Sequence, residues 1–221
     1  MDSITVGGMV ISSMPVGEYD RRAEILTNDL GRISAFARGA RKPSSPLVSA
    51  CRVFAFGEFE LYRGKSSYSL GSARIKNYFT ELSEDIVLTY YGYYFLELAR
   101  YFTREGEPAE EELYLLYQSL RALCSAKFDG RLVRAVYELK LLSIEGLCPD
   151  IDYVKGYREV SAGASYTYSF VINTEIGKLF TFKLSEEVLR EFADISHELI
   201  RRSTDKEFNS LKLLETLTGE D

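Results

Sequence analysis

The sequence predicts an α+β protein in which a small antiparallel β-barrel precedes a mostly helical domain. Two changes near residue 80 indicate this division. Apolar residues recur at every second position before it and at helical spacing after it. Residues 1–80 carry eleven Lys and Arg against seven Asp and Glu, a charge of +4, whereas residues 81–221 carry sixteen against twenty-six, a charge of −10. We therefore expect one domain at 1–80 and a second at 81–221.

Within the first domain, apolar and polar residues alternate over segments that turn sequences separate. Ile33, Ala35 and Ala37 alternate with their neighbours, and residues 28–31 and 63–66 contain the glycines that tight turns favour. Five short strands favour closure, because an open sheet of this size would expose its edges. The expected fold is a five-stranded OB-type β-barrel, with strands at 4–14, 19–27, 31–38, 52–63 and 66–76.

From Ser83 the apolar residues recur with a period of 3.6. Ser83 is the expected N-cap of a helix of about twenty residues. Pro108 opens a second helix, and Gly130 precedes a third, which Gly146 and Pro149 end. Two last helices are expected at about 185–202 and 205–218.

An insertion at about 150–184 interrupts the helical pattern. Residues 166–172 and 178–182 are rich in aromatic and β-branched side chains, and the five residues between them include Asn173 and Gly177. This arrangement predicts a β-hairpin insertion in the helical domain.

Composition excludes several classes of protein. Three cysteines are too few for a disulfide framework, and their odd number suits a reducing compartment, so we expect a cytoplasmic protein. No apolar run is long enough to span a membrane, and we expect no contact with one. The net charge of −6 and the pI of about 5.1 argue against nucleic acid, but they average over two halves of opposite charge.

Catalytic and metal-binding patterns are weak in this sequence. His197, the one histidine, lies mid-helix and is interpreted as a solvated or partly packed residue. Gly7, Gly8 and Gly39 belong to no phosphate-binding pattern. The three cysteines and His197 lack the close pair that a structural zinc site needs. We expect no cofactor and no enzymatic activity, with a divalent-metal nuclease in the acidic half as a weaker alternative.

The basic half favours nucleic acid as a partner. Single-stranded DNA is bound by cations that neutralise phosphates beside aromatic faces that stack on bases, and OB barrels present such surfaces. The alternative is an ordinary solvated barrel face with a tethering loop. The predicted DNA-binding residues, with Phe36 and Tyr68 as stacking surfaces, are Arg32, Phe36, Arg38, Arg41, Lys42, Arg63, Lys65, Tyr68, Arg74 and Lys76.

A set of short segments, spread over nearly the whole chain, has a distinctive sequence. These segments are residues 10–20, 26–27, 31–33, 37–41, 54–57, 60–62, 90–94, 141–149 and 210–212. In the same order they resemble the RecO family of bacterial recombination mediators, and residues 31–41 are the most specific part. The resemblance implies an OB domain that binds single- and double-stranded DNA, a helical C-terminal domain, and a non-enzymatic role in strand annealing and recombinase loading with RecR and single-stranded-DNA-binding protein.

One segment departs from the family. Many relatives place a Cys-x-x-Cys pair, half of a four-cysteine zinc element, shortly after the segment that corresponds to 146–152. This chain has Val154 and Tyr157 where that pair would align. The resemblance therefore carries no zinc role over to this chain.

Arginines of the helical domain suggest a peptide site. Arg121, Arg131 and Arg134 are expected to lie beside a groove lined by Leu and Tyr, which suits an acidic peptide with an aromatic end. The resemblance implies that this peptide is the C-terminal tail of single-stranded-DNA-binding protein. The alternative is that these arginines pair with Glu138 and neighbouring carboxylates on a solvated face.

A rival function for the whole chain is a protein-binding OB and helical scaffold with only incidental DNA affinity. A salt titration distinguishes the two, because phosphate neutralisation makes affinity fall steeply with salt.

Overall fold

The computed structural model describes residues 3–65 and 67–219, and the chain divides into two compact units. The barrel unit comprises Met1–Thr80 with Leu96–Leu113, and the helical unit comprises Glu81–Phe95 with Tyr114–Asp221. The domain boundary at residue 80 stays a prediction. The barrel unit includes, besides residues 1–80, the end of one helix and the start of the next.

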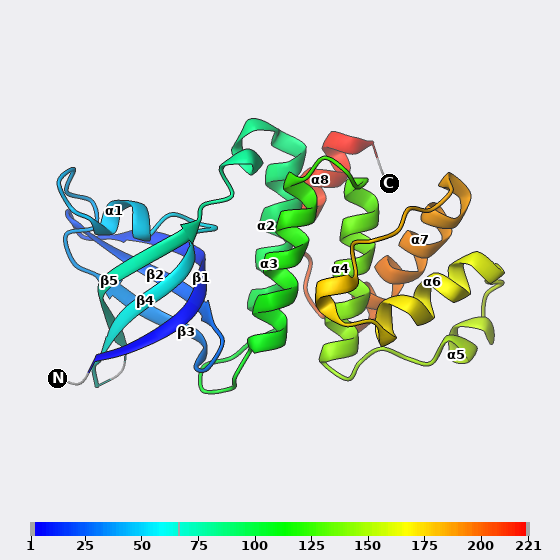
Figure 1. Cartoon of the computed structure of the whole chain (residues 1–221), viewed down its shortest axis with the longest axis horizontal. Coiled ribbons are helices and arrows are strands. Elements are labelled where there is room, and N and C mark those ends of the chain that lie inside the picture. The colour runs from blue at the N-terminus through cyan, green and yellow to red at the C-terminus, as the bar shows by residue number, and fades with distance from the viewer. Residues whose placement is uncertain (1–2, 66, 220–221) are drawn as a thin grey trace. The chain divides into compact units, whose positions relative to one another are not determined.

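Five strands close into a barrel in the order β1, β2, β3, β5, β4, which confirms the predicted OB-type fold class (Figure 1). The β3–β5 pair is parallel, and the other four pairs are antiparallel. The elements of the barrel are β1 (Ser3–Val16), β2 (Asp20–Thr27), β3 (Gly31–Ala37), the short helix α1 (Leu47–Ala50), β4 (Phe56–Arg63) and β5 (Tyr68–Asn77).

The predicted alternation on β3 separates the barrel core from an outer polar face. Ile33, Ala35 and Ala37 are at most 1% exposed, whereas Arg32, Ser34 and Phe36, which alternate with them, are partly exposed. Successive side chains of a strand point to opposite faces, so one segment supplies both the core and the outer surface.

The fourth strand begins at Phe56, four residues later than predicted. The backbone of Phe54 has a φ of +71°, and its N–H donates to the carbonyl of Val10 at 2.9 Å. The N–H of Val10 in turn donates to the carbonyl of Ala55 at 3.0 Å. Residues 52–55 therefore form a turn against β1, which alternation of residue types alone does not distinguish from a strand.

The segment Leu96–Leu113 packs on the barrel at the β2–β3 turn. The guanidinium of Arg100 makes two contacts with the carboxylate of Glu24, at 3.0 Å from Nη2 and 2.8 Å from Nε. The N–H of Gly106 donates to the carbonyl of Leu30 at 2.9 Å. Side-chain and backbone bonds together attach this segment to the barrel.

The helical unit is built around α4, in which residues 132–142 are all buried. The α6 and α7 helices pack against α4. The ring of Tyr137 stacks on Phe95 at 4.3 Å, and its hydroxyl donates to the carbonyl of Phe95 at 3.0 Å. The remaining elements are η1 (Thr80–Glu84), α2 (Ile86–Phe102), α3 (Glu110–Cys124), α4 (Gly130–Ile144), α5 (Ile151–Lys155), α6 (Ala162–Asn173), η2 (Ile176–Lys178), α7 (Glu186–Ser203) and α8 (Asn209–Thr218).

The N-cap of α2 is Asp85 rather than the predicted Ser83. The Asp85 carboxylate accepts hydrogen bonds from the N–H groups of Val87 at 2.7 Å and Leu88 at 3.2 Å. Ser83 lies instead in the preceding η1 turn. Both residue types are good caps, so the choice depends on where the chain enters the helix.

The predicted β-hairpin at 166–182 is wrong, because most of this segment is the helix α6 followed by the short turn η2. The hydroxyl of Ser161 caps the start of α6 by accepting from the N–H of Ala164 at 3.2 Å. At the other end, the ammonium group of the nearly buried Lys140 donates to the carbonyls of Ile172 and Thr174 at 2.9 and 2.8 Å. These tertiary contacts outweigh the β propensity of the aromatic residues.

We expect Gly31→Ala to destabilise the barrel unit. A non-glycine residue in the left-handed region costs about 1–3 kcal/mol, and this substitution should cost more than that. Gly31 has a φ of +65°, and a Cβ there would lie 2.0 Å from the carbonyl oxygen of Arg104 and 2.3 Å from that of Glu107. Urea unfolding measures the effect. Gly106→Ala is the matched control, because its φ is +83° but nothing lies within 4 Å of an added Cβ. Equal destabilisation of the two variants would contradict the steric explanation.

Candidate nucleic-acid interface

The β1–β2 turn and residues 38–46 together form what we call the barrel tip, and hydrogen bonds hold the two segments together. The N–H of Arg41 donates to the carbonyl of Tyr19 at 2.8 Å, and its Nη1 donates to the carbonyl of Gly17 at 2.9 Å. The N–H of Gly39 donates to the carboxylate of Asp20 at 2.7 Å, and the ammonium of Lys42 lies 5.1 Å from the Tyr19 ring centroid. The tip is therefore organised by contacts within the chain itself.

Positive charge gathers at this tip. Residues 17–22 and 38–42 contain five cations and two carboxylates, a net charge of +3. The predicted phosphate-binding residues Arg38, Arg41 and Lys42 are all exposed. In the part of the chain that the structure describes, none of these three forms an ion pair. Their charges are available to an anionic partner such as a phosphate backbone.

A row of outward-facing side chains crosses the barrel next to the tip. Phe36 of β3 lies opposite Arg22 of β2, which lies opposite Met14 of β1. The guanidinium of Arg22 donates to the hydroxyl of Ser34 at 2.6 Å, which keeps it on the outer face. The predicted stacking residue Phe36 thus has a cation beside it. Sequence reasoning missed Arg22, although its alternation with the buried Ala23 marks it as outward-facing.

Tyr68 is not a stacking surface, contrary to the prediction. It is 7% exposed and belongs to the barrel core, level with Ala35 on the neighbouring strand. The β4–β5 register shifts between the Leu61–Leu70 and Glu60–Ser72 pairs, so Tyr68 and Leu70 before the shift and Ala73 and Ile75 after it all face the core. This phase is set by strand pairing, which the sequence pattern does not show.

The side chain of Arg32 contacts other residues of the barrel unit. Its Nε donates to the carbonyl of Thr103 at 3.2 Å, and its Nη1 lies 3.9 Å from the carboxylate of Glu24. Arg32 therefore belongs with the docked segment Leu96–Leu113, at the opposite end of β3 from the tip.

Arg63 and Lys65 do not join the tip. Since Tyr68 pairs with Ala35 in parallel register, the turn carrying Arg63 and Lys65 extends towards the start of β3, roughly 20 Å along the strand direction from Arg38. Both side chains are exposed. Arg74 and Lys76 lie near Glu58 on β4, and Lys76 binds that carboxylate at 2.7 Å.

Of the three predicted peptide-binding arginines, Arg134 is buried. It is 3% exposed, and its Nε donates to Glu138 at 3.0 Å, so it cannot meet a peptide at the surface. The prediction for Arg134 is wrong because its side chain points into the unit from α4, a helix buried nearly all round. Arg131 pairs with Asp129 and Glu186, each at 2.7 Å. Arg121 is exposed, with its guanidinium 5.9 Å from the Tyr117 ring.

Glu138 is a fully buried carboxylate that joins three helices. It accepts hydrogen bonds from Tyr94 of α2 at 2.6 Å and from Arg134 of α4 at 3.0 Å, and it contacts Nδ1 of His197 on α7. Burial by itself raises the pKa of Glu138, but the charges of His197 and Arg134 and the hydrogen bonds from His197 and Tyr94 lower it to about 2. His197 is thus a partly packed helix residue with a structural partner.

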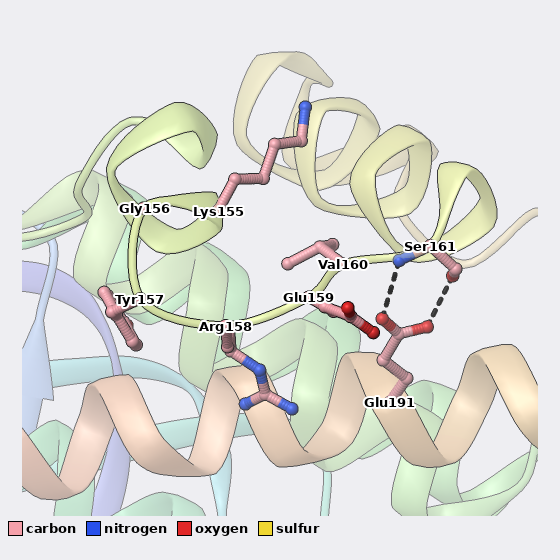
Figure 2. Close-up of a pocket in the computed structure, with 8 residues that line it drawn as sticks. All are labelled: Lys155, Gly156, Tyr157, Arg158, Glu159, Val160, Ser161 and Glu191. Carbon is pink, nitrogen blue, oxygen red and sulfur yellow. Dashed lines mark hydrogen bonds between the residues drawn. The ribbon is translucent and has the colours of Figure 1, made fainter.

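A surface pocket lies between α5 and α7, and hydrogen bonds within it account for its main polar groups (Figure 2). Both the N–H and the hydroxyl of Ser161 donate to the carboxylate of Glu191, with the N–H at 2.7 Å. Arg158, which also lines the pocket, pairs with Glu198 at 3.1 Å. We interpret the pocket as the capped start of α6.

Neither Val154 nor Tyr157, the residues expected to depart from a Cys-x-x-Cys pattern, supplies a thiolate. Val154 is fully buried and packs as an apolar residue, and the ring of Tyr157 lies 4.7 Å from the guanidinium of Arg202. Among the described residues, no three His, Cys, Asp or Glu side chains are grouped to hold a metal ion. No described helix is both long and apolar enough to cross a membrane.

Comparisons with known proteins agree over both parts of the chain. Residues 1–79 match a family model described as Recombination protein O N terminal, and residues 83–155 match one described as Recombination protein O C terminal. The DNA repair protein RecO of Acetivibrio thermocellus is 27% identical over 98% of both chains. That of Alkaliphilus metalliredigens is 30% identical over 80% of this chain and 70% of the relative, and that of Clostridium novyi is 26% identical over 95% and 92%.

We expect Glu138→Gln to destabilise the helical unit by about 3–5 kcal/mol near neutral pH, because the buried Arg134 would then keep only the more distant carboxylate of Glu215, at 3.7 Å. The folded pKa of about 2 lies below the ordinary 4.5, so the carboxylate's contribution is complete above about pH 4.5 and is lost as the pH falls towards 2. The difference in unfolding free energy between parent and variant should therefore shrink over this window. Urea unfolding followed by far-UV ellipticity at several pH values measures it, and a difference independent of pH would contradict the assignment.

Proposed function

Because the chain belongs to the RecO family of DNA repair proteins, we propose that it acts in recombinational repair by binding DNA, promoting the annealing of complementary strands and aiding the loading of a recombinase. It would do so without catalysis or a cofactor, and it would act in the cytoplasm, where the bacterial chromosome lies. Its partners would be single- and double-stranded DNA, RecR and single-stranded-DNA-binding protein.

The barrel tip is the observation that carries this proposal. Arg38, Arg41 and Lys42 form an exposed group of cations on a segment that four contacts attach to the β1–β2 turn. Phe36 and Arg22 continue the surface on the outer face. Cations on an organised surface beside an aromatic ring are what binding of a DNA strand requires, with the cations on phosphates and the ring on a base.

Annealing needs a surface that holds a strand without covering its base-pairing edges. Contacts to phosphates leave these edges free, and stacking on Phe36 uses the face of a base rather than its edge. The tip supports this mode because its exposed cations are placed to contact phosphates, and Phe36 beside them offers a ring to the face of a base. A protein-binding scaffold with incidental DNA affinity is the rival function, and the salt dependence of DNA binding separates the two.

We expect the double charge reversal Arg41→Glu and Lys42→Glu to weaken DNA binding strongly. The slope of log affinity against log salt should fall by about 0.7–0.9 for each phosphate that the variant no longer neutralises. Fluorescence anisotropy with labelled single- and double-stranded DNA over a series of salt concentrations measures both effects. Stability should change little, because both side chains are exposed.

The matched control is Lys178→Glu with Lys183→Glu, which makes the same charge change at exposed lysines of the helical unit. Its affinity for DNA should fall only by the small amount that the change in net charge of the whole chain causes. If the tip variant binds like the parent at low and high salt, DNA does not contact Arg41 and Lys42. Release of labelled product in the presence of magnesium would contradict a role without catalysis.

We propose that the acidic tail of single-stranded-DNA-binding protein meets the helical unit at Arg121 and Arg131. Both guanidinium groups are accessible, and Arg121 lies over the ring of Tyr117, which offers an apolar contact beside the charge. Arg131 would have to exchange part of its pairing with Asp129 and Glu186 for the tail's carboxylates. Arg121 is therefore the stronger candidate.

We expect Arg121→Glu to weaken binding of the tail peptide to the intact protein by about tenfold, the size of a missing hydrogen bond to a charged group. Isothermal titration calorimetry at two salt concentrations measures this. Arg190→Glu on α7, an exposed arginine outside the proposed site, is the control. The proposal fails if the parent binds no tail peptide, or if Arg121→Glu and Arg190→Glu bind it equally well.

A further inference from the structure

The β1–β2 hairpin extends past the part of β1 that belongs to the barrel wall. β1 pairs with β4 only from Ser3 to Met9, whereas its pairing with β2 continues to Val16 opposite Asp20. The last residues of β1 thus have a strand neighbour on one side only. Pro15 lies in this stretch, where it discourages pairing with another sheet.

Large apolar side chains are exposed at the end of this hairpin. Met14 is 50% exposed, Val16 is 37% exposed and Tyr19 is 49% exposed. Among the described residues of the barrel unit, these are three of the four large apolar side chains with such exposure, the other being Val48. Such a concentration at one hairpin is typical of a binding surface rather than of chance exposure.

The charge around these side chains identifies the kind of partner. Arg22 lies directly across from Met14, and Lys42 lies against the ring of Tyr19. With Arg38 and Arg41 beside them, the apolar group lies within a region of net charge +3. An apolar surface bordered by cations fits a polyanion that also offers exposed apolar faces, and nucleic-acid bases provide those faces.

We propose that the apolar end of the β1–β2 hairpin stacks on the terminal base pair where a DNA duplex meets a single strand. This rests on the proposed function, because the same cations would hold the phosphates. Inside a duplex the faces of base pairs are covered by their neighbours, whereas at a junction one face is open. Met14, Val16 and Tyr19 would cover that face and remove it from water.

The single strand beyond the junction would continue along the row of outward-facing residues. Phe36 lies two strands away from Met14, about 10 Å across the sheet, which is within reach of the first nucleotides beyond the junction. A base beyond the junction would stack on Phe36, with Arg22 between the two contacts. The site therefore takes the product of partial annealing, a paired segment with an unpaired continuation.

The test compares three DNAs that carry the same label and share one sequence: a single strand, a duplex with a single-stranded tail, and a duplex whose ends are closed by loops. Anisotropy titrations should show that the parent binds the tailed duplex about five- to tenfold more tightly than either other DNA. The variant Met14→Ser with Val16→Ser should lose this preference. Its affinity for the single strand and its salt slope should stay near the parent's, because no charge is removed.

A matched control removes a similar apolar pair elsewhere. Leu213 and Leu217 of α8 are each 47% exposed, and Leu213→Ser with Leu217→Ser should keep the preference for the tailed duplex. As a second readout, 2-aminopurine in the terminal base pair should change its fluorescence on binding the parent and not on binding the hairpin variant. If the double variant unfolds, Tyr19→Ser replaces it. This substitution keeps the backbone carbonyl that accepts from Arg41 and removes the contact of the ring with Lys42.

Each outcome decides between the claims. Equal affinity of the parent for the three DNAs overturns the junction site and leaves DNA binding at the tip intact. A preference that survives in the hairpin variant overturns the assignment to Met14 and Val16. Failure of the parent to bind any DNA overturns the proposed function and this inference together.

Discussion

Closure of five short strands into a barrel determines where the other features of the barrel unit lie. The interior takes only one side chain in two, so β3 turns Ala35 and Ala37 inward and Arg32 and Phe36 outward. The two ends of β3 then serve different purposes. Near its start, the segment Leu96–Leu113 is attached by backbone and side-chain bonds. Beyond its end, the chain is free to form the cationic tip.

The helical unit depends on a different constraint, the burial of one carboxylate. Glu138 has no exposed surface, so it is stable in its charged form only with Tyr94, Arg134 and His197 around it. These partners come from α2, α4 and α7, and the carboxylate therefore links three helices that are far apart in sequence. Such a cluster favours one packing arrangement over others, because any arrangement that separates the partners leaves a buried charge.

The proposed function depends on an uneven distribution of charge along the chain. An acidic chain with a pI of about 5.1 is repelled by DNA as a whole, but the cations of the tip lie together on one end of the barrel, within residues 1–80, whose net charge is +4. Screening limits the influence of distant carboxylates to about 10 Å, so the local charge governs the encounter with DNA. The apolar hairpin beside these cations extends the surface from phosphates to the faces of bases.

The sequence by itself determined the period change near residue 80, the closed five-stranded barrel, most of the helices and the exposed cations at Arg38, Arg41 and Lys42, because alternation and turn signals are local. Tertiary structure decided the rest. Strand pairing turned Tyr68 inward. Helix packing buried Arg134, a predicted surface residue, beside Glu138. Contacts such as the one between Lys140 and the end of α6 favoured a helix where a hairpin was predicted. Each of these outcomes depends on a partner many residues away in the chain, and no local pattern contains that information.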